Sequence, residues 1–344
     1  MDLPTVWFAL IGVFLVGYAV LDGFDLGVGI LHPFARDEAE RTVLMDAIGP
    51  FWDGNEVWLV VFGGAMFAAF PEAYAAAFTA FYLPFLLVVV ALIFRAVAIE
   101  FRHHAEGPAT RLVWDVAFFL ASLLATFLFG VAVGNSIRGL PLGVDRTFAG
   151  SVTDLLQPYA LLVGLFAVAT LAMHGSMFLL LRTEGDFQRR VFRWAWTSFG
   201  IFLSVYVLET VVTLVVIPRS ADNFRRHPWV WVVPVLNVLA VANIPRSLYQ
   251  RRPAAAFVSS SATIAAFTFL FGVALYPNLI ASTLGPDFDL TIRRAASSPA
   301  TLRNLLIAAG LGMPFVLAYT AVTYWVFRGR VRPAESRSGS AEGH

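Results

Sequence analysis

The sequence predicts an all-α polytopic membrane protein with nine transmembrane helices. Three observations lead to this fold class. The mean hydropathy of the 344 residues is +0.73. Of these residues, 58% are hydrophobic and only 14% are charged, whereas soluble domains carry about 25% charged residues. The apolar residues gather in stretches of roughly 20, the length that a helix needs to cross a bilayer. These values exclude a soluble, a disordered and a nucleic-acid-binding protein.

Two features of the composition limit the chemistry. The chain has no cysteine, which excludes thiolate metal sites, iron–sulfur clusters, disulfides and redox thiols within it. The formal net charge is only +1, so no bulk field attracts an anionic partner. All 24 basic residues are Arg, which we interpret as a bias of the source genome. Residues 1–5 lack the basic start of a cleavable signal peptide.

Nine apolar stretches are expected to cross the membrane as helices, because a backbone in hydrocarbon must satisfy its own hydrogen bonds. They do not show the alternation with period two that β-barrel strands require. A four-residue turn is expected from Pro71, and Pro234 and Pro245 predict a kinked or short seventh helix. The nine stretches cover about residues 6–31, 51–70, 78–101, 112–136, 155–181, 192–217, 229–249, 256–280 and 303–327.

The distribution of Arg predicts the orientation. Sixteen Arg residues fall on the side of the C-terminus and eight on the side of the N-terminus, and the positive-inside rule then places the C-terminus in the cytoplasm and the N-terminus outside. Residues 1–328 form the membrane domain in this prediction, and 329–344 form a polar cytoplasmic tail without fixed structure. The eight outer residues are Arg138, Arg146, Arg219, Arg225, Arg226, Arg293, Arg294 and Arg303.

Four acids form the strongest candidate site. Asp22 and Asp25 lie three residues apart in the first stretch and therefore share one helix face. Asp53 and Glu56 repeat this spacing at the start of the second stretch, which enters from the same, cytoplasmic side. Charges within a span cost roughly 2.5–3.5 kcal/mol each, and close carboxylates tend to share protons. We therefore interpret the four acids, at one depth, as a proton-entry route. The structural alternative is a helix cap at Asp53 and an ion pair between an Asp and Arg95.

Other polar residues of the spans receive structural interpretations. Arg95 and Glu100 are expected to form ion pairs near the cytoplasmic end of the third stretch. His174 is the only His in the body of a span, and one buried His could hold at most one side of one haem. We interpret His174 as a hydrogen-bonded structural residue. Asp115 is expected to cap its helix, and Glu209, in the middle of its span, has no explanation.

Two motifs dominate the first hundred residues. They are Gly-Tyr-Ala-Val-Leu-Asp-Gly-Phe-Asp-Leu-Gly-Val-Gly at 17–29 and Trp-Asp-Gly-Asn-Glu-Val-Trp at 52–58. On these motifs the sequence resembles subunit II of the cytochrome bd quinol oxidases. The resemblance is dense over residues 10–105 and stays collinear to about residue 327. Some members of that family carry Gln where this chain has Glu56.

The resemblance implies two four-helix bundles plus one peripheral helix, nine spans in all. It implies a complex in the bacterial cell membrane with a related subunit I, which ligates haems b and d. That complex oxidises quinol and reduces O2 to water without pumping, and it generates a proton gradient by cytoplasmic proton uptake. Asp22, Asp25 and Asp53 match positions assigned to a proton route, and Trp58 matches an area proposed for oxygen access. No haem is expected on this chain. The family also includes members with a quinone bound in subunit II, and small single-span accessory subunits are considered as further partners.

Three alternatives remain open at the level of sequence. A cyanide-insensitive bb-type oxidase differs from the bd type in the haems of its partner subunit. A proton-coupled secondary transporter would use the acids as its coupling site, although such sites usually lie near the membrane midplane in repeated halves. A purely structural assembly subunit would need the acids for stability but not for turnover. In the oxidase interpretation, the chain is not expected to be active alone.

Overall fold

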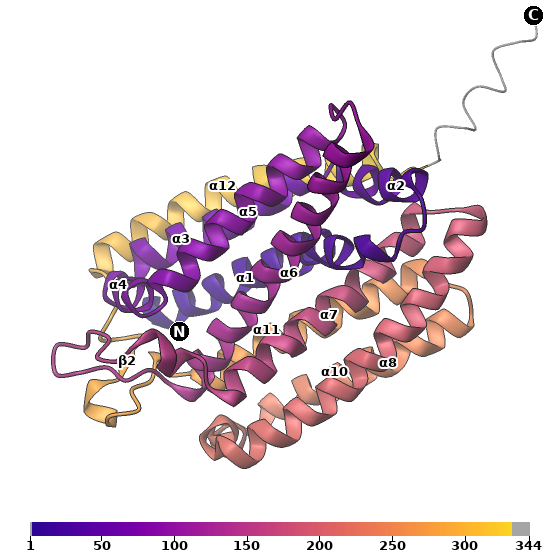
Figure 1. Ribbon diagram of the computed structural model, residues 1–344. Coiled ribbons are helices and arrows are strands. Elements are labelled where there is room, and N and C mark those ends of the chain that lie inside the picture. The colour runs from indigo at the N-terminus through magenta and orange to yellow at the C-terminus, as the bar shows by residue number, and fades with distance from the viewer. Residues whose placement is uncertain (1, 332–344) are drawn as a thin grey trace, which may run out of the picture.

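The computed structural model describes residues 2–331, which form long helices that run back and forth along one direction (Figure 1). The long helices are α1 (Leu3–Leu31), α3 (Trp52–Ala69), α5 (Tyr82–Arg102), α6 (Pro108–Arg138), α7 (Pro158–Arg182), α8 (Gly185–Val216), α10 (Val232–Tyr249), α11 (Pro253–Leu275) and α12 (Pro299–Val326). Shorter helices are α2 (Glu38–Ile48), α4 (Pro71–Ala80) and α9 (Asp222–Arg226). Strands β1 (Asn278–Ile280) and β2 (Leu290–Thr291) pair antiparallel.

Each of the nine apolar stretches corresponds to one long helix within residues 2–331. Eight of these helices are long and apolar enough to cross a membrane. The helix that is not among the eight is α3, which has 18 residues and carries Asp53, Asn55 and Glu56 in its first turns. The chain is therefore a multi-pass membrane protein with eight candidate spans. The expectation of nine depends on α3 and stays a prediction.

Proline marks the start of several helices. α6, α7, α11 and α12 each begin with a proline, where the missing N–H would have had no helical partner and the fixed φ suits the first turn. Pro71 begins the ten-residue helix α4 in the same way. The expected turn of four residues is therefore wrong, because the Ala-rich sequence that follows Pro71 has a high helix propensity.

One further segment differs from the expectation. The eighth stretch ends as a helix at Leu275 rather than at residue 280, because Tyr276 and Pro277 leave the helix and β1 follows. The segment that follows is closed by the β1–β2 pair and by a 2.8 Å hydrogen bond from Asn278 Nδ2 to Asp289 Oδ2. Pro245 does lie inside the short helix α10, as expected for the seventh stretch.

The amphipathic helix α2 was not expected from the sequence. Its N-cap, Asp37, accepts a 2.9 Å hydrogen bond from the backbone N–H of Glu40, which satisfies one of the free donors of the first turn. One face of α2 buries Val43, Leu44 and Ile48 against the ends of the long helices. The helix is too short and too charged to give the apolar signal of a span.

Helix α1 lies at the centre of the molecule and packs against α3, α6, α7, α11 and α12. Glycine permits the closest of these approaches. A Cβ atom on Gly27 would lie 1.9 Å from the carbonyl oxygen of Leu171 in α7, and one on Gly29 would lie 2.0 Å from Ser122 Oγ in α6. In contrast, a Cβ atom on Gly63 or Gly64 of α3 would meet no described atom within 4 Å. That face of α3 is open in the described chain.

Helix α12 buries one residue, Leu302, and lies along α3 and α1 (Figure 1). Its identification as the expected peripheral helix stays a prediction. The grouping of the remaining long helices into two four-helix bundles stays a prediction.

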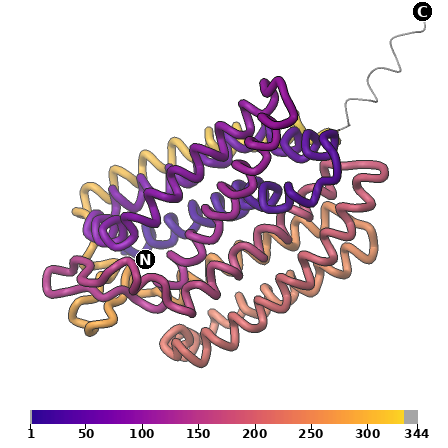
Figure 2. Tube along the Cα trace, in the orientation of Figure 1, coloured from indigo at the N-terminus to yellow at the C-terminus, as the bar shows by residue number. Residues whose placement is uncertain are grey.

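The first and last described residues lie at opposite ends of the helices (Figure 2). At one end, Asp2 Oδ2 lies 3.2 Å from Nε of Arg293, beside β2. At the other end, the N–H of Val331 donates to the carbonyl of Arg182 at 2.8 Å. Such a placement fits an odd number of crossings. Of the expected tail at 329–344, residues 332–344 lie outside the described part of the chain.

Candidate proton-transfer site

Two carboxylates of α1 form the centre of the candidate site. Asp22 and Asp25 have no exposed surface and lie in the part of α1 that leads toward α2. Arg95 of α5 is equally buried, and its Nη2 donates to Asp22 Oδ1 at 2.7 Å. The same Nη2 pairs with Glu56 of α3. One guanidinium therefore joins acids from two helices, as the structural alternative for Arg95 anticipated. We call this group the acid cluster: Asp22, Asp25, Glu56 and Arg95.

Asn55 and Tyr324 extend the acid cluster, and the sequence analysis missed both. Asn55 Nδ2 donates to Asp25 Oδ2 at 2.8 Å and to the carbonyl of Leu21 at 3.1 Å. The hydroxyl of Tyr324 in α12 donates to Asn55 Oδ1 at 3.1 Å. Asn55 belongs to the motif at 52–58 and could have been singled out there. Tyr324 lies 269 residues farther along the chain, and no local pattern marks it.

Asp53 lies apart from the buried acids. It is exposed in the first turn of α3 and makes neither an ion pair nor a capping hydrogen bond with the described residues. The Glu56 side chain, three residues on, is 25% exposed. The four acids are therefore a series from the surface at Asp53 to the interior at Asp22 and Asp25. The expectation that the four acids lie at one depth in the membrane stays a prediction; within the described chain Asp53 is exposed and Asp22 and Asp25 are enclosed.

Several polar atoms of this region are buried without a hydrogen-bond partner among residues 2–331. They are Asp22 Oδ2, Asp25 Oδ1, Tyr18 Oη, and Nε and Nη1 of Arg95. Buried polar groups in native proteins are normally paired with protein or with ordered water. Five such atoms around one cluster are typical of a site that water or another chain completes.

Trp58 lies on the side of α3 that faces α1. Its side chain is 5% exposed, and the indole covers Gly17, where a Cβ atom would lie 2.2 Å from Trp58 Cε3. Its Nε1 has no described partner. This placement is compatible with the apolar surroundings expected near an oxygen path, and that role stays a prediction.

Glu100 does not form the expected ion pair. Its side chain is exposed and pairs with no Arg or His in the described part of the chain. Glu100 follows Arg95 by five residues, which turns it about 140° around a helix of 3.6 residues per turn. Arg95 points inward to the acid cluster, so Glu100 faces outward.

A second buried ionic group lies where α2, α5 and α6 meet. Asp115 is 5% exposed, and it accepts from Arg102 Nε at 2.5 Å and lies 3.5 Å from Arg41 Nη1. Arg102 also pairs with Glu38 at 3.0 Å. Asp115 is eight positions into α6 rather than at its cap, so the capping interpretation is wrong. Arg111 Nη1 also lies 3.4 Å from Glu38 Oε1. We call this group the arginine cluster: Arg41, Arg102, Arg111, Asp115 and Glu38.

Both ring nitrogens of His174 have partners within the chain. Nε2 lies 3.0 Å from the carbonyl of Val20, and Nδ1 lies 2.8 Å from Ser260 Oγ. Because a carbonyl only accepts, the neutral tautomer with a proton on Nε2 fits, and Nδ1 then accepts from Ser260. The ring also stacks on Phe257, with ring centroids 5.1 Å apart. This geometry leaves no free nitrogen for an iron atom.

Glu209 gains a local partner in the structure. Thr213, one turn farther along α8, donates to Glu209 Oε1 at 2.6 Å, and the Thr213 hydroxyl also lies 2.9 Å from that of Tyr159 in α7. No group of three or more His, Asp or Glu residues within 2–331 could hold a metal ion.

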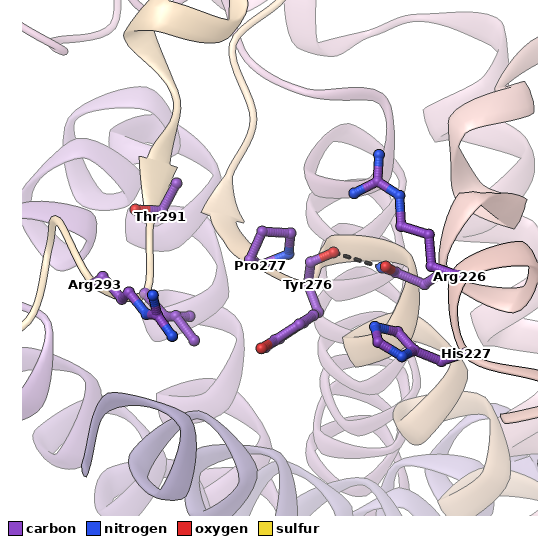
Figure 3. Close-up of a pocket in the computed structure, with 8 residues that line it drawn as sticks. Arg226, His227, Tyr276, Pro277, Thr291 and Arg293 are labelled. Carbon is purple, nitrogen blue, oxygen red and sulfur yellow. Dashed lines mark hydrogen bonds between the residues drawn. The ribbon is translucent and has the colours of Figure 1, made fainter. Parts of the chain in front are cut away.

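A hollow of about 340 Å³ lies on the end of the molecule that carries β1 and β2 (Figure 3). Arg226 and His227 line it from the segment that follows α8, and Thr291 and Arg293 line it from β2 and its flank. Asn223, also in its wall, donates to the carbonyl of Tyr276 at 2.5 Å. None of the four candidate acids lines this hollow, so it is separate from the acid cluster.

The comparisons with known proteins agree across the whole chain. Residues 3–327 match the family described as cytochrome bd terminal oxidase subunit II. The chain is 34% identical to cytochrome bd-I ubiquinol oxidase subunit 2 of Escherichia coli (strain K12), over 96% of this chain and 95% of that one. It is 35% identical to cytochrome bd ubiquinol oxidase subunit 2 of Bacillus subtilis (strain 168), over 97% and 98%.

The solved structure of bd oxidase from Geobacillus thermodenitrificans has the same fold. It matches with a TM-score of 0.78 at 20% identity and covers 95% of this chain and 99% of that one. The buried acids of α1, the motif at 52–58, the helical architecture and the two full-length relatives all point to one family. This chain belongs to the family of cytochrome bd terminal oxidase subunit II.

Proposed function

We propose that this chain is subunit II of a quinol-oxidising terminal oxidase of the bacterial cell membrane, and that its acid cluster carries protons toward the site of O2 reduction. The observation that carries the proposal is the composition of the acid cluster. Three carboxylates, two of them without exposed surface, face a single guanidinium. The names of the two full-length relatives support the reaction class.

The charge count gives the acid cluster its capacity for protons. Arg95 neutralises one carboxylate, so full ionisation of Asp22, Asp25 and Glu56 would leave two uncompensated negative charges at the core of the molecule. Uncompensated buried charges are costly, and close carboxylates therefore share protons. A carboxyl group of the cluster whose proton is not fixed by one hydrogen-bond partner can release that proton to a neighbouring acceptor.

The series of acids gives the direction. A proton would enter at exposed Asp53, pass to half-buried Glu56 three residues away, and reach Asp22 through the neighbourhood of Arg95. Asp25, held by Asn55, lies on the same face of α1 as Asp22. The free oxygens Asp22 Oδ2 and Asp25 Oδ1 are the positions where a bridging water would accept and release a proton.

The partner in this proposal is a related subunit I. In the family resemblance, subunit I ligates haems b and d, which supply the electron transfer from quinol to O2 when they are bound there. We assign no haem to His174, because both of its ring nitrogens are already used within the chain. The open face of α3 at Gly63 and Gly64 is one surface where another helix fits closely. A bb-type complex would present the same acids, since the difference lies in the partner.

The overall reaction balances with proton uptake from one side. Two quinols and one O2 give two quinones and two waters, and the four protons of the waters enter through this route while the quinols release four on the outer side.

With the C-terminus in the cytoplasm and the N-terminus outside, the acid cluster lies toward the cytoplasm. A reporter fused after Gly343 that is active only inside cells tests this orientation; activity only outside would contradict it.

The test is oxygen consumption per haem in membranes that carry Asp22→Asn, Asp25→Asn or Asp53→Asn. A neutral amide keeps most of the hydrogen bonds but cannot take up and release a proton. We expect quinol-driven turnover to fall by about tenfold or more, as for a lost proton-transfer group, while haem content stays near that of the unchanged complex. Full turnover in all three variants would refute the route. Haem loss in step with turnover would favour the structural assembly role instead.

A further inference from the structure

A basic hollow lies at the end of the molecule opposite β1 and β2, between the start of α8 and the end of α10. Its volume is about 530 Å³. Three arginines and three aromatic residues make up most of its lining, and none of the lining residues is acidic; they are Arg189, Phe192, Arg193, Trp196, Leu248, Tyr249 and Arg251. None of its lining residues belongs to the acid cluster, and the proposed reaction does not use it.

The charge of this hollow is only partly compensated. Arg193 is exposed and has no hydrogen bond or ion pair within the described residues. Arg189 pairs with Asp186, whose side chain is 90% exposed. Arg246 and Arg252 lie close by in sequence and add to the charge. Since the whole chain carries a formal charge of only +1, this concentration of arginine is a local feature that attracts anions.

Arg251 occupies a backbone position that normally belongs to glycine. The N–H of Arg252 donates to the carbonyl of Ser247 at 2.9 Å and that of Arg251 to Leu248 at 3.0 Å, the pattern of a Schellman cap. The residue in the left-handed conformation of that cap is Arg251, with φ of 52°. Side chains are disfavoured there, and the Arg251 guanidinium lies over the Phe192 ring, 5.3 Å from its centroid. Arg251 therefore contributes a cation to the lining of the hollow at a position that a side chain rarely occupies.

The surroundings select the kind of anion. Trp196 is 44% exposed and Tyr249 is 84% exposed, as expected for aromatic side chains at the level of lipid head groups. Beyond them, the outward faces of α8 and α10 are apolar, with Val207 and Val238 more than half exposed (54% and 57%). A phospholipid presents its phosphate first, then its glycerol and then its acyl chains. This order matches the arginines at the end of α8 and α10, the aromatic side chains beside them and the apolar helix faces beyond.

We propose that this hollow binds the phosphate of an anionic phospholipid, with Arg193 and Arg251 as the anchoring cations. Basic pockets between helices on the cytoplasmic side are suited to such head groups. The inference does not depend on the proton route, because it uses none of its residues.

The test titrates the purified, delipidated subunit I–subunit II complex with dioleoyl phosphatidylglycerol, with dioleoyl phosphatidylcholine and with inorganic phosphate, and counts bound molecules by native mass spectrometry. The double variant Arg193→Gln/Arg251→Gly removes both anchors, and glycine suits the left-handed position, so the fold is kept. At about fivefold for each arginine, the double variant should bind phosphatidylglycerol roughly 25-fold more weakly. The matched control, Arg246→Gln, removes one charge from the same end of α10 outside the hollow and should change binding less than about twofold.

Three results would overturn the proposal. The double variant could retain phosphatidylglycerol as the unchanged complex does. Arg246→Gln could weaken binding as much per charge as the double variant, which would indicate diffuse attraction rather than a site. Inorganic phosphate could bind as tightly as phosphatidylglycerol, which would assign the hollow to a free anion. Tighter binding of phosphatidylglycerol than of phosphatidylcholine, lost only with the anchors, supports it.

Discussion

The acid cluster and the arginine cluster each enclose a buried Asp–Arg pair, Asp22 with Arg95 and Asp115 with Arg102, but their charge balance differs. In the acid cluster, three carboxylates face one arginine. In the arginine cluster, Asp115 and Glu38 face Arg41, Arg102 and Arg111, so each carboxylate lies beside two arginines and the group carries one net positive charge. Both Asp22 and Asp115 are almost fully enclosed, with exposed fractions of 0% and 5%. Burial alone therefore does not separate the two groups.

The difference in balance predicts a difference in role. Every carboxylate of the arginine cluster is matched by arginine, so the cluster has no reason to hold protons, and it fixes α2 against α5 and α6. A group with excess carboxylates must hold protons to stay near neutral, and their number can change. We therefore expect changes in the arginine cluster to affect assembly, and changes in the acid cluster to affect turnover.

The largest effect is expected from Arg95→Met. This substitution removes the only cation of the acid cluster and leaves its carboxylates unmatched, at a cost of about 3–5 kcal/mol for a broken buried pair. We expect little assembled complex in membranes, measured as haem content. The double variant Arg95→Met/Asp22→Asn removes one of those carboxylates and should recover part of the complex. Equal loss in both variants would show that charge matching is not the function of Arg95.

The next effect is expected from Asp115→Asn. The loss of one buried partner leaves Arg102 and Arg41 undermatched, which should lower the thermal stability of the complex, by up to about 3 kcal/mol. Turnover per assembled haem should stay within about twofold of the unchanged complex. A fall in turnover per haem similar to that of Asp25→Asn would remove the distinction between the two clusters.

Glu56→Gln should give the smallest effect. The amide still accepts a hydrogen bond from Arg95, and Glu56 is the most exposed acid of the cluster, at 25%. We expect turnover to fall by less than about tenfold, below the loss at Asp22 or Asp25. Turnover measured across several pH values in the same membranes checks this order. A larger loss at Glu56 than at Asp25 would reverse the proposed sequence of the route.

The helices could be predicted from the sequence because a membrane span needs a long apolar run. The exceptions are instructive. Helix α2 is amphipathic and α4 is short, so neither produces such a run. Asp115 was predicted to cap its helix because the sequence shows only its position near the start of that helix. Its actual partner, Arg102, belongs to the preceding helix, and this contact depends on how α5 and α6 pack. Glu100 was assigned an ion pair from its sequence neighbourhood, yet its helical angle points it away.

The candidate site was predictable where its residues share one helix. The spacing of Asp22 and Asp25 places them on one face, and the structure buries both. The contacts between helices could not be read in this way. Tyr324 reaches Asn55 from α12 only because the start of α3 packs on it, with the Phe51 and Tyr324 ring centroids 4.6 Å apart. The surface position of Asp53 likewise follows from where α3 begins.

The most direct test of the account is proton uptake by the purified complex in proteoliposomes, followed with a pH-sensitive dye after mixing the reduced complex with O2. Asp25→Asn and Asp115→Asn are compared, since each converts one buried carboxylate to an amide in a different cluster. We predict that Asp25→Asn slows uptake from the side of the C-terminal tail by about tenfold or more, and that Asp115→Asn leaves the rate unchanged. Uptake at the unchanged rate in Asp25→Asn, or equal slowing in both variants, would contradict the account.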